Sequence, residues 1–274
     1  MADVDRAHHH ARVALVTGAN HGIGAATATA LAAAGARVVA AHWPIRVPDG
    51  RGLPDEYARA RSGGAEAVVE AIRRAGGQAH PVTADLADPD SASLLFDEAE
   101  RIFGPVQILI NNASSWLADT FTPAAADGLG RALEPVSADT FDRQFAVDAK
   151  ASALLIAEFS RRHGARRADW GRIIGLTSGG ALGFPDEVSY GAAKAAMESY
   201  TMSAAAELAG FGVTANVVHP PVTDTGWVTD DVRAWVEADR GHFSVAQPAD
   251  VADVIAFLAS DRARLITGNV IRMR

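Results

Sequence analysis

A glycine-rich loop between an apolar run and an alanine-rich segment places the strongest constraint on the fold. Residues Arg12–Thr17 form a short apolar run typical of a buried parallel strand. The loop Gly18–Gly24 follows at once, and a helix is predicted over Ala25–Ala34. Such glycines let the backbone approach phosphates, and the helix start supplies free amides and a positive dipole end. With the next apolar run, Arg37–Ala41, this order predicts a dinucleotide site on a parallel α/β sheet.

A second pattern lies in the segment Leu176–Tyr200. Tyr190 and Lys194 are four residues apart at the start of an alanine-rich helix, so they share one face. An ammonium group beside a phenol favours the phenolate and eases proton movement near neutral pH. Ser178 follows the apolar run Ile173–Leu176, and a strand there would carry its hydroxyl to the edge of the sheet. The three side chains predict a proton donor, a group that tunes it and a hydrogen-bond donor. The alternative is a solvated helix face that carries Tyr and Lys by accident.

The rarity of lysine supports a specific role for Lys194. Of the 25 basic residues in the chain, only Lys150 and Lys194 are lysine. A lysine kept among arginines suggests a need for a compact ammonium whose pKa can be adjusted.

Composition sets the broad class. The chain has 274 residues, of which 49% are hydrophobic, and this fits one large α/β domain or two small ones. No apolar run approaches a membrane span, and the polar start Met1–Arg12 shows no secretory signal. The absence of cysteine excludes disulfides and thiolate metal sites and fits a cytoplasmic protein. A net charge of −8 argues against nucleic-acid binding. His8–His10 fit a flexible tail over residues 1–11 better than a metal site.

Several motifs together resemble the classical short-chain dehydrogenase/reductase family. They are Thr17-Gly18-x-x-x-Gly22-Ile23-Gly24, Asn111-Asn112-Ala113, Ser178, Tyr190-x-x-x-Lys194, and Pro220 with Thr225, and the resemblance covers residues 12–271. It implies a single Rossmann-type domain over residues 12–274, in which a doubly wound parallel sheet of about seven strands is flanked by helices. Cofactor and substrate would share the carboxyl edge of this sheet.

The resemblance also implies the cofactor contacts. They are Gly18, Asn20, His21, Gly22, Ile23, Gly24, His42, Asp85, Leu86, Asn112, Ala113, Lys194, Pro220, Thr223 and Thr225. Relatives that prefer NAD carry an acidic residue where this chain has His42. His21 and His42, with Arg46, could instead meet a 2′-phosphate, which favours NADP(H) over NAD(H). If both histidines only cap loops, the preference stays open. Asp85 could equally be a helix N-cap.

Three positions depart from the family pattern. Asp148 replaces an asparagine that holds a water beside the lysine in many relatives. An aspartate there could maintain a proton relay through Lys194 and also oppose phenolate formation, or it could only hold local backbone groups. Ser114 and Pro221 each replace a glycine, which affects the space near the nicotinamide and the shape of a loop. The end of the chain, Arg272–Arg274, lacks the usual glycine-ended tail, which puts the usual tetramer contacts in doubt.

Four further segments complete the predicted organisation. Residues 43–64 predict an inserted surface loop, and residues 116–135 predict a second insertion beside the substrate entrance. Residues 222–245 predict an apolar substrate lid. Ser137–Arg162 predicts one long helix with Ser137 as N-cap.

The resemblance implies reduction of a ketone to a secondary alcohol, or the reverse, with NADPH. Tyr190 would give the proton, Ser178 would hydrogen-bond the carbonyl oxygen, and Lys194 would lower the Tyr190 pKa and hold the ribose, with Asp148 as a relay member. The substrates would be small carbonyls or alcohols, as in 3-oxoacyl carrier-protein reductases, including carrier- or CoA-linked ones. No metal, nucleic acid or membrane is expected, and the protein would be a homodimer or homotetramer. The alternatives are an NAD-dependent secondary-alcohol dehydrogenase and a catalytically weak, cofactor-binding homologue.

Overall fold

The computed structural model describes residues 12–48, 50–180, 183–239, 241 and 243–274. The predicted tail over residues 1–11, with His8–His10, lies outside these residues. The main sheet has seven parallel strands in the order β3-β2-β1-β4-β7-β8-β9. The strands are β1 (Val13–Thr17), β2 (Arg37–His42), β3 (Gln78–Thr83), β4 (Val106–Asn111), β7 (Gly171–Leu176), β8 (Val213–His219) and β9 (Val270–Arg272). The predicted fold class, a single Rossmann-type α/β domain, is confirmed.

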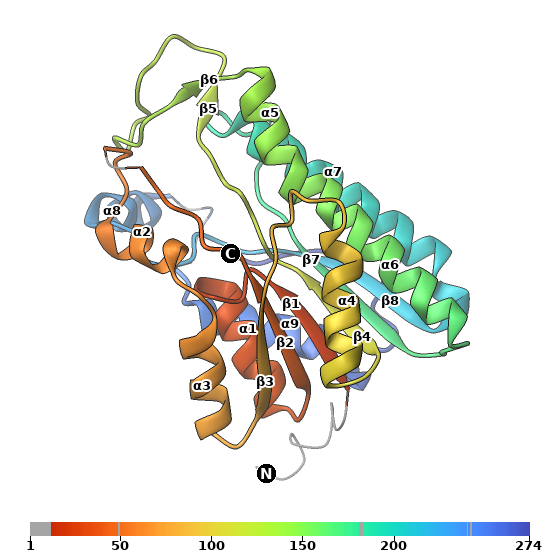
Figure 1. Cartoon of the computed structure of the whole chain (residues 1–274). Helices are drawn as coiled ribbons and strands as arrows, with labels where there is room; N and C mark the ends of the chain where they lie inside the picture. The colour runs from red at the N-terminus through yellow and green to blue at the C-terminus, as the bar shows by residue number, and fades with distance from the viewer. Residues whose placement is uncertain (1–11, 49, 181–182, 240, 242) are drawn as a thin grey trace.

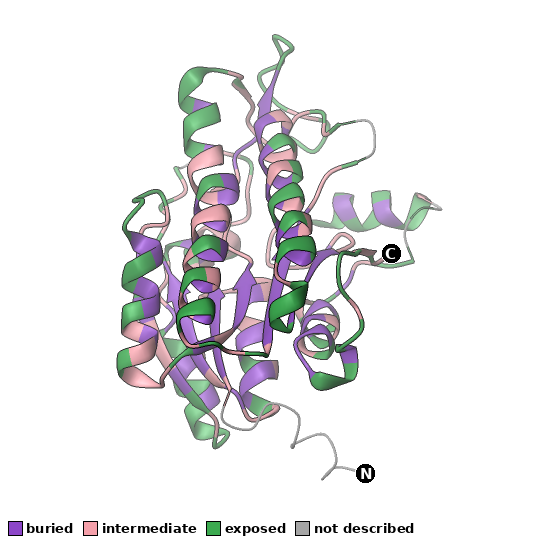
Figure 2. Ribbon diagram, turned by 90° about the vertical axis from the view of Figure 1, so that its right-hand side faces the viewer, coloured by how far each residue is buried: buried purple, intermediate pink, exposed green. Residues whose placement is uncertain are grey.

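Helices cover both faces of the sheet (Figure 1). One face carries α1 (Gly22–Ala33), α3 (Glu66–Arg74) and α9 (Pro248–Leu258), and the other carries α4 (Ser91–Ile102), α6 (Ser152–Ala165) and α7 (Val188–Glu207). Alternate strand residues pack toward opposite layers: Val16 belongs to the first core and Leu15 to the second, and both are fully buried. Figure 2 shows the result, with buried strands inside helices whose outer surfaces are exposed.

The strand order reverses between β1 and β4, since the chain builds outward to β3 and then returns to the other side of β1. Ligands of doubly wound folds bind in the crevice outside the carboxyl ends of the strands at such a point. Thr17, Asn111 and Leu176 end three adjacent strands here. The topology therefore brings the glycine loop and the Ser178 region to one edge.

The two insertions are more ordered than the sequence predicted. Residues 43–64, expected to be a surface loop, contain the helix α2 (Asp55–Ser62), which begins with two acidic residues that suit a helix N-terminus. The segment 116–135 contains β5 (Asp119–Thr120) and β6 (Glu134–Pro135), which pair with each other. In Figure 1, both α2 and α8 (Asp230–Ala238) of the predicted lid lie on the side of the carboxyl edge.

The long helix predicted over Ser137–Arg162 has a widened turn. It consists of α5 (Ala138–Phe145), a π-helical segment over Ala146–Ala151, and α6. Ser137 is the N-cap as predicted, because its hydroxyl accepts a hydrogen bond from the Thr140 amide at 3.2 Å. π-helical turns frequently mark functional sites, and this one carries Asp148.

None of the helices in the described part of the chain is both long and apolar enough to cross a membrane. The lid helix α8 is instead amphipathic, since it buries Val232 and Val236 and leaves Trp235 half exposed.

Candidate active site

A cavity of about 910 Å³ lies at the carboxyl edge of the sheet. Ser178 and Tyr190 line it together with every predicted cofactor contact except Lys194. Lys194 and Asp148 do not line the cavity and are buried, with exposed fractions of 3% and 0%. The structure thus brings the predicted residues together around one space.

The glycine loop is shaped for close approach of backbone to a ligand. Gly18 has a φ of +65°, which glycine adopts without strain. A Cβ at Gly24 would lie 2.1 Å from the Gly18 carbonyl oxygen, so no larger residue fits there. The Asn112 side-chain amide donates to the carbonyl oxygens of Thr17 (2.8 Å) and Gly18 (3.1 Å) and fixes the loop to the end of β4. Helix α1 has no acidic residue in its first turn to offset its positive end. These features fit a dinucleotide diphosphate.

The three predicted catalytic side chains converge. Ser178 follows β7, and Tyr190 lies in the first turn of α7. One turn later, the Lys194 Nζ lies 5.6 Å from the centre of the Tyr190 ring. A hydrogen bond between Ser178 and the Tyr190 hydroxyl favours the phenolate. Ser178 and Tyr190 both line the cavity that the glycine loop also lines.

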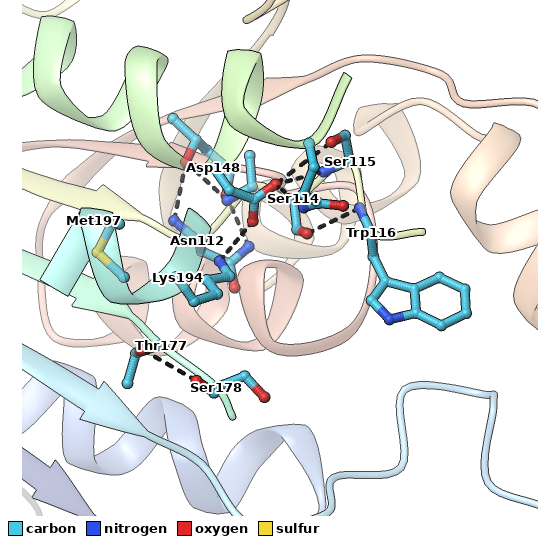
Figure 3. Close-up of polar contacts among 12 residues, drawn as sticks. Asn112, Ser114, Ser115, Trp116, Asp148, Thr177, Ser178, Lys194 and Met197 are labelled. Atoms are coloured by element: carbon cyan, nitrogen blue, oxygen red, sulfur yellow. Dashed lines mark hydrogen bonds and ion pairs between the residues drawn. The ribbon is translucent and has the colours of Figure 1, made fainter. Parts of the chain in front are cut away.

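Asp148 forms a direct ion pair with Lys194, in which Oδ1 lies 3.0 Å from Nζ (Figure 3). Its Oδ2 accepts hydrogen bonds from the Gln144 side-chain amide at 2.6 Å and from the Ser115 backbone amide at 3.0 Å. Both roles considered for Asp148 therefore have contacts to support them, because the carboxylate touches the lysine and a backbone amide. The ion pair places a negative charge beside the lysine that was expected to act on Tyr190.

The pKa of Tyr190 is raised well above its ordinary value, mainly by burial and then by the charges of Asp148 and Glu187. The hydrogen bond from Ser178 acts in the opposite direction but does not overcome them. The net direction differs from the lowered pKa that the Tyr–Lys spacing suggested, mainly because the spacing did not reveal the burial of the phenol, whereas opposition from Asp148 was among the expectations. Near neutral pH the phenol therefore keeps its proton.

The two histidines proposed for a 2′-phosphate have different surroundings. Burial, followed by the charge of Arg61, lowers the pKa of His21 to about 4, so this side chain is neutral at neutral pH. His42 is buried, with Nε2 3.2 Å from the Thr83 hydroxyl and 3.9 Å from a carboxylate oxygen of Glu66. Arg46 is exposed and does not line the cavity. His21 thus offers no positive charge to a phosphate.

Asp85 was predicted either to contact the cofactor or to cap a helix. Asp85 Oδ1 accepts a hydrogen bond from the Ala87 amide at 2.9 Å, but α4 begins only at Ser91. The alternative that Asp85 is a helix N-cap is therefore wrong, and Asp85 stabilises a turn on the cavity wall beside Leu86.

The turn 220–225 lies against the glycine loop. A Cβ at Gly22 would lie 2.8 Å from the Thr225 methyl carbon, so the two segments are in tight contact. Within the turn, the Thr223 hydroxyl donates to the carbonyl oxygen of Pro221 at 2.8 Å. Pro221 thus accepts a hydrogen bond within the turn and lines the cavity together with Pro220 and Thr223.

Sequence reasoning missed a polar cluster that joins the second insertion to the catalytic helix. The Arg131 guanidinium lies 2.8 Å from one carboxylate oxygen of Glu187, and the Trp116 indole donates to the other at 2.9 Å. Asp127 also pairs with Arg131, at 2.6 Å. The sequence shows only that Asp127 and Arg131 are four residues apart, a spacing at which two side chains can pair. Their contact with Glu187 depends on the tertiary fold and could not be predicted from spacing.

Besides Tyr190, six aromatic residues among those described line the cavity. They are Trp43, Tyr57, Trp116, Phe184, Trp227 and Trp235. Across the described ranges, no group of three or more His, Asp or Glu residues is arranged to hold a metal ion.

Comparison with known families decides the classification. A family model described as short chain dehydrogenase matches residues 12–45, and one described as enoyl-(acyl carrier protein) reductase matches residues 57–273. The chain belongs to the short-chain dehydrogenase/reductase family. Between the two matches lie only residues 46–56, within the α2 insertion.

Individual relatives support the same classification. A cis-4-hydroxycyclohexanecarboxylate dehydrogenase of Sinomonas cyclohexanicum is 36% identical over 264 residues, which cover 95% of this chain and 94% of the relative. An NADPH-dependent aldehyde reductase-like protein of Arabidopsis thaliana is 33% identical, with 95% and 92% covered. The crystal structure of the angucycline C-6 ketoreductase LanV with bound NADP is similar, with a TM-score of 0.75, 32% identity and 97% of each chain covered. The protein is thus an NAD(P)-dependent oxidoreductase.

Proposed function

We propose that this protein reduces a ketone to a secondary alcohol with NADPH, and that Tyr190 donates the proton. The observation that carries the proposal is that the half-buried Tyr190 and Ser178 line the same cavity as the glycine loop, with Lys194 one helical turn beyond Tyr190. The phenol carries the proton that reduction consumes. The similarity to an NADP-bound ketoreductase supports the reductase over the alternative of an NAD-dependent alcohol dehydrogenase.

The residues divide the work as follows. The bound nicotinamide would supply hydride to the carbonyl carbon. Ser178 donates a hydrogen bond to the carbonyl oxygen and stabilises the negative charge that develops there. Tyr190 transfers its phenolic proton to the same oxygen. Lys194, held by Asp148, orients the cofactor ribose and completes a route by which the phenol regains a proton.

The walls of the cavity favour an uncharged ketone with a broad apolar or aromatic surface. Aromatic rings line the cavity, and Arg131 forms ion pairs with both Asp127 and Glu187. A charged substrate group would have to compete with those pairs. A carrier- or CoA-linked substrate and the homodimer or homotetramer stay predictions from the family resemblance.

NADP(H) is the cofactor we propose, in keeping with the NADP-bound ketoreductase and the NADPH-dependent relative. The test is a fluorescence titration of the purified protein with NADPH and NADH, followed by a panel of aliphatic and aromatic ketones monitored by NADPH absorbance. We expect NADPH to bind at least tenfold tighter, about 1.4 kcal/mol, and an aromatic ketone to be reduced. Equal or reversed cofactor affinity would overturn the cofactor assignment. A protein that binds NADPH and reduces no ketone would instead favour the catalytically weak homologue.

A further inference from the structure

Arg61 occupies an unusual position on the inserted helix α2. It is the only buried residue of this helix, with an exposed fraction of 5%. An arginine is normally the residue that a surface helix leaves in water. Here its guanidinium lines the main cavity, whereas Arg59, two residues earlier, is exposed.

The guanidinium has few partners for a buried cation. One nitrogen donates to the Trp116 carbonyl oxygen at 3.4 Å, and the Tyr57 ring centre lies 5.8 Å from the guanidinium carbon. Within the described ranges, no carboxylate lies within 4.0 Å of Arg61. Removing a charge from water costs several kcal/mol unless an anion pairs with it. A guanidinium has five donors in a planar fork, so most of its donors remain available to an anionic ligand in the cavity.

The helix is fixed to the glycine loop, which determines where this cation lies. The Asn20 side-chain amide donates to the carbonyl oxygens of Ala60 (3.2 Å) and Gly63 (3.0 Å), on either side of Arg61. The Tyr57 ring also meets the ring of His21 edge to face, with centroids 6.1 Å apart. Arg61 is close enough to His21 for its charge to lower the pKa of that histidine. The guanidinium is therefore held against the loop whose shape fits a diphosphate.

We propose that Arg61 binds a phosphate group of the dinucleotide, and that Asn20 positions it by holding α2 on the glycine loop. The inference rests on the proposed function only in that the ligand is a nicotinamide dinucleotide. The planar fork of arginine matches two phosphate oxygens and forms charge-assisted hydrogen bonds with them. The inserted helix then has a role in cofactor binding, and Arg61 supplies the positive charge that neutral His21 cannot.

The experiment compares wild type, Arg61→Gln, Arg61→Lys and the control Arg59→Gln in fluorescence titrations with NADPH and with NADH. We expect Arg61→Gln to weaken binding at least tenfold, Arg61→Lys to recover part of the loss, and Arg59→Gln to change the Kd less than twofold. The salt dependence of the Kd should also be smaller in Arg61→Gln, because one ionic contact is gone. A loss with both cofactors supports contact with the diphosphate, and a loss with NADPH alone supports contact with the 2′-phosphate. Wild-type affinity of Arg61→Gln for both cofactors would overturn the inference.

Thermal unfolding without cofactor separates this role from a structural one. Removal of a buried cation that lacks an anion should leave the Tm of Arg61→Gln unchanged or raise it. A lower Tm than wild type would show that Arg61 serves the fold and would contradict the proposal. The proposed function fails separately, if wild type binds neither cofactor or reduces no ketone. If wild type binds and turns over while Arg61→Gln behaves identically, only the inference about Arg61 fails.

Discussion

Replacing Asp148 by asparagine tests how the buried carboxylate controls the catalytic tyrosine. The Lys194 Nζ lies 3.0 Å from Asp148 Oδ1 and 5.6 Å from the centre of the Tyr190 ring. Because these separations can at most add, the carboxylate oxygen lies no farther than about 8.6 Å from that ring centre. Asparagine keeps a similar shape and can still accept a hydrogen bond from Lys194, so the substitution removes mainly the charge.

The structure gives the size of the effect. Two unit charges about 8.6 Å apart interact by about 2 kcal/mol at an effective dielectric constant of about 20. That energy corresponds to roughly a thirtyfold change in the acid dissociation constant of the phenol. Asp148→Asn should therefore lower the pKa of Tyr190, since the negative charge of Asp148 is one of the causes that raise it.

The assay is the pH dependence of kcat/KM for oxidation of the alcohol that the enzyme forms, because this direction needs the phenolate. We expect the rising limb of the profile to move to lower pH by about one unit or more in Asp148→Asn. Asp142→Asn is the matched control, since it removes the same charge from an exposed position on α5. Circular dichroism and the NADPH Kd should confirm that the variant is folded. An unmoved limb, or one displaced to higher pH, would refute the electrostatic reasoning.

Three further predictions test other parts of the structure. Gly24→Ala should weaken binding of both cofactors at least tenfold and lower the free energy of unfolding by about 1–3 kcal/mol, because its Cβ would lie 2.1 Å from a backbone oxygen. Fluorescence titration and urea unfolding measure the two effects. The control Gly164→Ala, whose Cβ meets nothing within 4 Å, should change neither the cofactor affinity nor the free energy of unfolding. Ser178→Ala should reduce kcat for ketone reduction by about 10²–10³-fold with an unchanged NADPH Kd, as expected when one donor to a developing oxyanion is lost, and a near-wild-type kcat would contradict this role. Hydrogen bonds from two arginines of the same helix lower the pKa of Glu158 from 4.5 to about 2, so its contribution to stability is present above about pH 4.5 and is lost as the pH falls toward 2. In urea unfolding, the free energy of unfolding of Glu158→Gln should fall less than that of wild type as the pH drops from about 4.5 to 2. An identical pH dependence of the two free energies would contradict this role of Glu158.

The fold could be read from the sequence because its determinants are local. Buried parallel strands appear as continuous apolar runs. A strand, the glycine loop and a helix in this order predict a dinucleotide-binding site. Tyr190 and Lys194 lie on one helix, so their proximity follows from helix geometry alone. Ser178 follows an apolar run, so a strand was expected to carry it to the edge of the sheet, whereas the number of about seven strands came from the family resemblance.

The features that the sequence did not predict depend on tertiary contacts between distant segments. The raised pKa of Tyr190 has burial as its largest cause and the charge of Glu187 as a further one, and neither was visible in the sequence. From the sequence alone, Arg61 resembles an ordinary surface residue. Its burial becomes clear only in the structure, where hydrogen bonds from Asn20 hold its helix against the glycine loop. Glu187 likewise gains its role only when the second insertion folds over the start of α7. Hydrophobic periodicity carries no information about such pairings.

The measurement that tests the account most directly follows both the hydride and the proton donor in one reaction. Wild type and Tyr190→Phe are each mixed with a ketone from the panel and with NADPH deuterated at the transferring position, and deuterium in the product alcohol is measured by mass spectrometry. We predict that wild type places deuterium on the carbonyl carbon. Tyr190→Phe should bind NADPH with an unchanged Kd but transfer deuterium about 10²–10⁴-fold more slowly, the range for loss of a general acid. Transfer at the wild-type rate in Tyr190→Phe would contradict the central claim that this phenol is the proton donor.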